Sequence, residues 1–276
     1  MKKIVCLSLL LLSCNIVLSQ SKVSQSKSEL NSSSSSSGNS GNSGSGRSNS
    51  SSDDDDEVSI WVEITWGIFK YGFIGDYKHE DHLYSNLTDY PYYNKESGNY
   101  ENYEVNEAEN SKKNFRFDLQ NNLLYSTKDL YANHFKLKIR PFQYFYVQTD
   151  FRQIFEKNKA THATDRLSLF NFNLGYDRVR LENFNLGWTI GSIYVGNEVK
   201  KAGFSFGLNT EIFIGHNISL LAAAKWSTIN SQPVHVYELE AKYHVKRGFV
   251  SLGYEHLKIA SPTYNFVSLG GGIYLN

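Results

Sequence analysis

The sequence predicts an all-β protein, a transmembrane antiparallel up-and-down β-barrel of about ten strands. From about residue 134 to the end, apolar and polar residues alternate in one segment after another. In Phe204–Ile212, for example, Phe, Phe, Leu and Ile share one face, and Ser, Gly, Asn and Glu share the other. A secretory signal precedes these segments, and nothing else in the sequence could cover so many apolar faces. We therefore expect a closed barrel with lipid outside and polar groups inside.

The chain begins with a secretory signal over residues 1–19. Its apolar stretch, Ile4–Leu12, follows a basic start and is too short to span a bilayer as a helix. Cleavage after Ser19 makes Gln20 the first mature residue. The alternative is a lipoprotein signal that is cleaved before Cys14.

Composition excludes several classes of function. The two cysteines, Cys6 and Cys14, both lie in the signal, so the mature chain has no disulfide, thiol nucleophile or Cys-ligated zinc. Lys plus Arg equals Asp plus Glu at 28 each, and this balance gives no support for nucleic-acid binding. The 19 Tyr and 17 Phe suit the aromatic girdles of a membrane barrel.

Residues 20–57 are predicted to be a disordered tether rich in Ser, Gly and Asn, because such a composition buries too little apolar surface to order itself. An acidic run, Asp53–Glu57, closes the tether. We interpret it as a solvated stop before the first strand, with a cation or partner contact as the alternative.

The barrel domain is predicted over residues 58–276. Its first strand is Val58–Phe69, and a long loop, residues 72–113, follows. Such a loop is too long to be a structureless link, so we expect it to be functional or partly ordered. Nine further strands are predicted at His134–Arg140, Gln143–Phe155, Arg166–Tyr176, Asn183–Val195, Ala202–Phe213, Asn217–Thr228, Val234–His244, Gly248–Leu257 and Tyr264–Leu275.

The strand count is predicted to be ten. Asn114–Leu119 also alternates, but the pattern fails at Asn121-Asn122-Leu123-Leu124. This segment is therefore either part of the loop or an eleventh strand that needs a twelfth, because bacterial single-chain barrels have even counts. A barrel of twelve strands is the alternative.

The two faces of the predicted strands differ in charge. The outward face carries no Lys, Arg, Asp or Glu, as a lipid face requires, and Trp188 and Trp226 fall on it. The predicted inward charges are Glu63, Lys136, Lys138, Arg140, Asp150, Arg152, Glu211, Lys225, Glu238, Glu240, Lys242 and Glu255. Six are basic and six are acidic, which favours a narrow lumen filled by ion pairs. The alternative is a selective pore, which would prefer charges of one sign.

With this signal, this alternation and the final strand Phe266–Asn276, the chain resembles bacterial outer-membrane β-barrel proteins over about Val58–Asn276. The family's members typically end on Phe, whereas this chain ends on Leu275-Asn276. The resemblance implies location in the outer membrane with both termini periplasmic, so that residues 72–113 face outside. The implied partners are the lipid bilayer with lipopolysaccharide, and the barrel-assembly machinery during insertion.

Two motifs could carry enzymatic chemistry. The last hairpin is similar in outline to that of outer-membrane lipid A deacylases, with His256 in place. Lys258 stands where those enzymes have their serine, and no Asp or Glu follows Glu255, so acyl transfer lacks a nucleophile and an orienting acid.

The second motif, His79-Glu80-Asp81-His82, could bind a divalent metal, and Asp76, Asp81 and Asp89 give the same loop the residue types of a barrel protease. Because no regular element is expected to fix this geometry, we predict no catalytic, cofactor or metal site. The loop's many Tyr and Asn residues suit recognition of a glycan or a protein. The predicted function is therefore a non-enzymatic barrel with a structural or surface-binding role. The alternatives are a small porin-like channel and, less favoured, a deacylase-like or protease-like enzyme.

Overall fold

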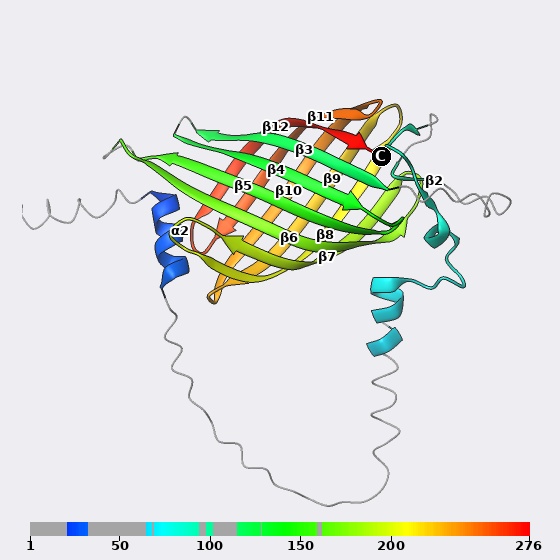
Figure 1. The fold of residues 1–276 in the computed structure, drawn as a ribbon, viewed down its shortest axis with the longest axis horizontal. Helices are drawn as coiled ribbons and strands as arrows, with labels where there is room; N and C mark the ends of the chain where they lie inside the picture. The colour runs from blue at the N-terminus through cyan, green and yellow to red at the C-terminus, as the bar shows by residue number, and fades with distance from the viewer. Residues whose placement is uncertain are drawn as a thin grey trace, which may run out of the picture.

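The computed structural model describes residues 21–32, 65–67, 69–93, 98–101, 115–127, 129–158 and 162–276. Ten antiparallel strands form a closed barrel in which each strand pairs with the next along the chain and the last pairs with the first (Figure 1). The strands are β3 (Arg116–Thr127), β4 (Leu130–Arg140), β5 (Phe145–Lys157), β6 (Thr164–Arg180), β7 (Phe184–Val195), β8 (Lys201–Ile214), β9 (Ile218–Ile229), β10 (Gln232–Val245), β11 (Gly248–Ile259) and β12 (Thr263–Leu275). The predicted fold class and strand number are confirmed.

Among the described residues, no helix is both long and apolar enough to cross a membrane.

One predicted strand is wrong. Residues 58–64 and 68 lie outside the described part of the chain, but Thr65–Gly67 and Phe69 are helical and run into the π-helix η2 (Lys70–Ile74). The rings of Trp66, Phe69 and Phe73 stack in sequence, with centroids 5.9 and 5.6 Å apart. Residues spaced three and four apart meet on one side of a helix, so the segment satisfies a helical period as well as the period of a strand.

The tenth strand is β3, which closes the barrel between β12 and β4. The predicted break at Asn121–Leu124 is wrong because alternation continues through it. Asn122 and Leu124 are buried, whereas Leu123 is exposed. What changes here is the chemistry of the inward face, which passes from polar at Asn122 to apolar at Leu124.

This apolar end of the lumen is filled by helix α2 (Lys22–Asn31), which lies in the predicted tether. Its Val23 and Leu30 are fully buried and join a cluster of inward side chains from the strands. The strand members are Leu124, Leu130, Ala132, Ile154, Leu167, Leu169, Ile193, Val195, Ile229, Val234, Val236, Leu257, Ile259, Tyr264 and Phe266. The prediction of disorder is therefore wrong for residues 22–31, and residues 33–57 lie outside the described part.

Polar contacts fix α2 in this mouth. The Ser21 side chain caps the helix by accepting a hydrogen bond from the Ser24 backbone N–H at 3.1 Å. The hydroxyl of Ser26 lies 2.9 Å from that of Tyr264. Asn230, in the turn between β9 and β10, donates to the carbonyl oxygen of Leu30 at 3.1 Å.

The helix lies at the rim opposite to the one where β3 begins and β12 ends (Figure 1). The start of β3 and the end of β12 share one rim, as an even strand number requires. Both termini were expected on one side of the membrane, whereas α2, near the N-terminus, lies at the rim opposite to the end of β12.

The mouth at the other rim is covered by residues 76–93 and 98–101, here called the cover. It contains the 3-10 helix η3 (Asp81–Tyr84) and a small hairpin of β1 (Asn86–Leu87) and β2 (Tyr100–Glu101). These residues belong to the predicted loop 72–113. The loop precedes the first barrel strand instead of joining two strands, and its described residues lie at the rim of the chain's barrel ends and not at the opposite rim.

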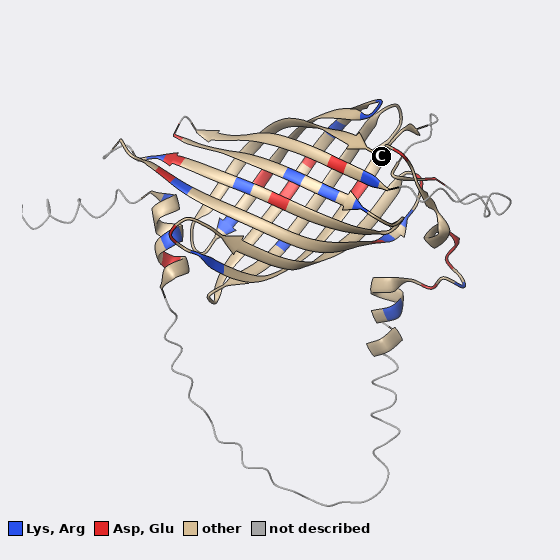
Figure 2. Cartoon of the chain, in the orientation of Figure 1, with Lys and Arg blue, Asp and Glu red and all other residues tan. Residues whose placement is uncertain are grey.

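The outward face is apolar. Its exposed side chains include Leu123, Leu269 and Phe204, at 64, 64 and 60 % exposure. One prediction for this face is wrong, because Arg166 is exposed on it at the start of β6, stacked over the ring of Phe155. It lies at the end of the strand, near the membrane interface, where an outward arginine destabilises a barrel much less than at the bilayer midplane. Figure 2 shows the charged positions crossing the middle of the barrel strands.

Candidate functional site: the ion-paired lumen

The predicted inward charges meet inside the barrel, except Glu63, which lies outside the described residues. At the centre, the guanidinium of Arg152 donates to Glu238 at 3.0 Å and to Glu255 at 2.8 Å. Lys136 pairs with Glu238 at 2.6 Å and lies 3.5 Å from Glu240. These residues come from β4, β5, β10 and β11, so the pairs cross the lumen and do not follow one strand.

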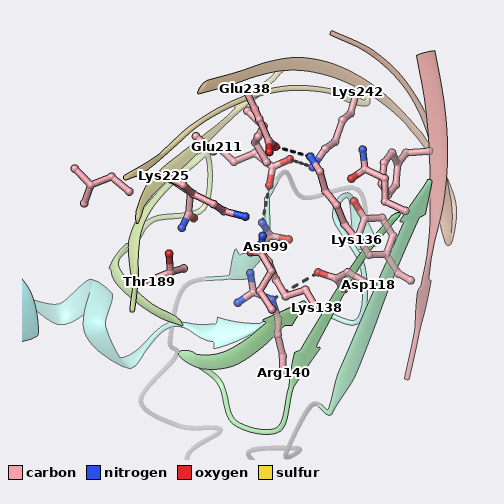
Figure 3. A pocket seen from close by; sticks show the side chains of 18 residues that line it. Asn99, Asp118, Lys136, Lys138, Arg140, Thr189, Glu211, Lys225, Glu238 and Lys242 are labelled. Carbon is pink, nitrogen blue, oxygen red and sulfur yellow. Dashed lines mark hydrogen bonds and ion pairs between the residues drawn. The ribbon is translucent and has the colours of Figure 1, made fainter. Parts of the chain in front are cut away.

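Two further pairs lie in the lumen, and Figure 3 labels Lys242 and Glu211 of the first pair and Lys225 of the second. Lys242 pairs with Glu211 at 3.0 Å, and Lys225 pairs with Asp150. Glu211 also accepts a hydrogen bond from the side chain of Asn99 at 3.2 Å. Through Asn99 the cover is therefore part of the same network.

At the covered rim, Arg140 pairs with Asp177 at 2.6 Å and Arg116 pairs with Asp118 at 2.7 Å. The hydroxyl of Tyr100, on the cover, donates to Asp177 at 2.5 Å. Tyr100 is fully buried, and so are Arg116, Arg140 and Asp177 to within 1 % exposure. The cover thus completes a buried polar cluster and does not simply lie over it.

Lys138 differs from the other lumen cations. Within the described part of the chain no carboxylate lies within ion-pair distance of its Nζ, which instead sits 4.5 Å from the ring centroid of Tyr146. Such a cation–π contact partly replaces a carboxylate partner.

The space left among these side chains is small. The lumen cavity measures about 70 Å³ and is lined by residues such as Asn99, Asp118, Lys138, Glu211 and Lys225 (Figure 3). This volume holds only a few water molecules. Buried charges need partners because isolated ions are strongly destabilised away from water, and the paired arrangement supplies them.

One group of lumen residues has the donor set of a metal site. His134, Glu238 and Glu255 each offer a ligand atom, and these atoms lie within 4.8 Å of one another. One nitrogen and two carboxylate oxygens could bind a divalent transition metal. However, Arg152 already bonds to both carboxylates and approaches His134 at 3.0 Å. The group therefore fits a guanidinium better than a metal.

The predicted deacylase-like residues lie outside the lumen. His256 is on the outward face of β11, and its Nδ1 donates to Oδ1 of Asn265 at 2.6 Å. Asn265 is an orienting group that the sequence interpretation missed, because only carboxylates were sought. Lys258 still occupies the serine position, so the pair His256–Asn265 has no hydroxyl beside it to activate.

The motif His79–His82 does not converge on one point. Nδ1 of His79 lies 2.6 Å from Asp76, and Nε2 of His82 lies 3.2 Å from Glu80. Glu80 is in turn held by Arg178 of β6 through two hydrogen bonds of 2.8 Å. Each histidine thus serves a different carboxylate, and the motif anchors the cover to the barrel.

Several lumen residues escaped prediction, namely Asn99, Tyr100, Arg116, Asp118, His134 and Asp177. Asp177 lies beyond the predicted end of its strand. Arg116 and Asp118 lie in Asn114–Leu119, which the sequence did not assign to either a loop or a strand. For Asn99 and Tyr100 no sequence signal exists, because they enter the lumen from a segment that is not part of the sheet.

No family model matches the chain, and no curated protein matches it. Solved outer-membrane barrels are similar to it. Ail of Yersinia pestis in a nanodisc has 11 % identity and a TM-score of 0.34, with 58 % of this chain and 99 % of that one covered. An outer membrane channel from Pseudomonas putida F1 has 6 % identity and a TM-score of 0.36, with 58 and 95 % covered. A loop-deleted OmpT, an outer membrane protein of Vibrio cholerae, has 12 % identity and a TM-score of 0.32, with 56 and 62 % covered.

The two faces of the barrel itself decide the class. Its sheet is closed, its exposed outward face is apolar and its buried inward face is ion-paired. Only helices and closed barrels satisfy every backbone group within a bilayer, and closed barrels with an apolar outer band belong to outer membranes. The chain is an outer-membrane β-barrel protein.

Proposed function

We propose that this protein is a closed, non-conducting and non-enzymatic barrel with a structural role in the outer membrane. The observation that carries the proposal is the lumen, where ion pairs leave a cavity of about 70 Å³. Both mouths are also covered by segments that precede the barrel in the sequence, α2 at one and the cover at the other. A path for solutes would have to break several buried ion pairs, each of which is costly to disrupt.

The predicted surface-binding role of residues 72–113 is not part of this proposal. Tyr100 is buried in the lumen cluster, and the ring of Tyr92 packs against Phe213 and His244. These tyrosines are used for sealing the mouth.

The test is single-channel conductance of the refolded full chain in a planar bilayer, with its gel shift on heating as the check of folding. We expect the heat-sensitive shift without conductance steps. As a matched comparison, Lys136→Gln with Glu238→Gln keeps the size of one lumen pair but removes its charge, and this variant should also stay silent. Steady ohmic steps from the wild-type chain would contradict the proposal and favour the porin-like alternative.

A further inference from the structure

A groove of about 400 Å³ runs along the outside of β8, β9 and β10. Small side chains, Ala222 and Ala224 of β9, line it between larger ones from the neighbouring strands. In the sheet register Ala224 lies between Leu208 of β8 and Tyr237 of β10, and Ala222 is the partner of Leu239. Because the outward face contacts lipid, this apolar groove suits an acyl chain.

Aromatic and polar tips gather at the end of the groove nearer α2. The indole N–H of Trp226 donates to the hydroxyl of Tyr237 at 3.2 Å. On the next strands, Tyr254 and His256 both donate to Oδ1 of Asn265, at 2.9 and 2.6 Å. Side chains with an apolar body and a polar tip are typical of the level where acyl chains meet head groups.

Basic residues occupy the last rows beyond these tips. Lys258 is the register partner of both His235 and Thr263. Lys22, from α2, donates to the carbonyl oxygen of Thr263 at 2.9 Å. Together with His256, these residues place four basic side chains at the α2 rim, directly beyond the groove.

The carboxylates of this region are bound by groups other than Lys22 and Lys258, and Glu156 of β5, for example, accepts from the backbone N–H of Val23 at 2.8 Å. Glu255 and Glu238 point into the lumen and pair with Arg152. Glu29, on α2, accepts hydrogen bonds from Ser261 and Gln25. In the part of the chain that the structure describes, neither Lys22 nor Lys258 takes part in an ion pair, so both are open to an external anion.

From this arrangement we infer a binding site for a phosphorylated, acylated lipid of the leaflet at the α2 rim. One acyl chain lies in the groove over Ala222 and Ala224, and a phosphate group contacts Lys258, with Lys22 and His256 beside it. Charge complementarity favours this head group, because within the described residues Lys22 and Lys258 have no carboxylate partner and both lie directly beyond the apolar groove. Basic pockets of this kind bind lipid head groups.

The experiment is native mass spectrometry of the full chain in detergent, with bisphosphorylated lipid A as the probe and its dephosphorylated form as the comparison. We expect one tightly retained lipid A. Lys258→Gln should weaken its retention about fivefold, because this is the factor by which one lysine near an anionic lipid surface strengthens binding. Ala224→Phe, which fills the groove, should weaken retention as well.

A second outward groove, of about 420 Å³ and lined by Phe172 and Tyr194, provides the matched control. Ser192→Phe fills that groove and should leave lipid retention unchanged, and the gel shift on heating verifies that each variant is folded. Equal retention of the dephosphorylated form would overturn the proposal. So would an equal loss from Ser192→Phe and Ala224→Phe, since this would indicate lipid that adheres without a site.

Discussion

At the scale of residues, Glu80 is the contact that ties the cover to the barrel wall. Its two carboxylate oxygens accept from the two terminal nitrogens of Arg178, each at 2.8 Å, and one of them also accepts from the backbone N–H of Asp76 at 2.7 Å. The hydrogen bonds from Arg178 lower the pKa of Glu80 below its ordinary value. Paired geometry of this kind is stronger than a single surface ion pair.

The lowered pKa predicts that the cover loosens in acid. Because the pKa of Glu80 is lower in the folded chain than in the unfolded one, its contribution is present above about pH 4.3 and is lost as the pH falls through the folded value. Glu80→Gln should weaken docking of the cover by about 0.5–1 kcal/mol at neutral pH and flatten this pH dependence. Hydrogen exchange of residues 76–93 between pH 6 and pH 3 measures both effects. Identical pH profiles for the variant and the wild type would show that another group controls the cover.

At the scale of elements, strands were predictable wherever one face was apolar and the other polar. From β5 to β12, each prediction overlapped the observed strand, because that alternation is a local property of the sequence. The signal failed on β3, where inward Leu124 belongs to the apolar cluster that includes Val23 and Leu30 of α2, so that both faces of the strand become apolar. It also failed at Trp66–Phe73, where strand and helix periods coincide. Both failures depend on what packs against the segment, and the local pattern does not contain that information.

Helix α2 could not be predicted either, because its composition is polar. Only Val23 and Leu30 give it apolar anchors, and these side chains and its hydrogen bonds meet strand ends that are far away in the sequence. The same holds for the lumen. The charged residues on the predicted strands were identified from the sequence. Their partners could not be, because they depend on which strands face each other across the closed barrel. Asn99 and Tyr100 could not be predicted because they enter the lumen from the cover.

The small size of its apolar anchor makes α2 separable from the barrel. Leu30→Ala removes a fully buried side chain and should cost about 2–5 kcal/mol, which is enough to release a ten-residue helix from its mouth. We expect trypsin to cut faster at Lys22 and Lys27 while the gel shift of the barrel stays unchanged. Ser28→Ala, at an exposed position of the same helix, is the control and should leave the cutting rate as it was. Loss of the gel shift together with α2 would instead make the helix part of the barrel's folding core.

At the scale of the whole molecule, the chain covers both mouths before its first barrel strand begins. The cover lies at the rim where β3 starts and β12 ends, and α2 lies at the opposite rim. Apolar packing closes the α2 mouth, whereas buried ion pairs close the covered one. This arrangement places a segment from near the N-terminus and the end of the last strand on opposite sides of the membrane.

Cysteine labelling tests this placement, because both native cysteines lie in the predicted signal and the mature chain then has none. Three exposed positions serve as single-cysteine sites: Ser28→Cys on α2, Ser261→Cys in the turn beside it, and His216→Cys in a turn at the opposite rim. If the rim of the barrel ends is periplasmic, a membrane-impermeant maleimide should label the first two on intact cells. It should label His216→Cys only after the outer membrane is opened. Labelling at Ser261→Cys without labelling at Ser28→Cys would mean that α2 does not occupy the outer mouth of the inserted barrel. Labelling of His216→Cys alone would mean that the barrel is inserted the other way round.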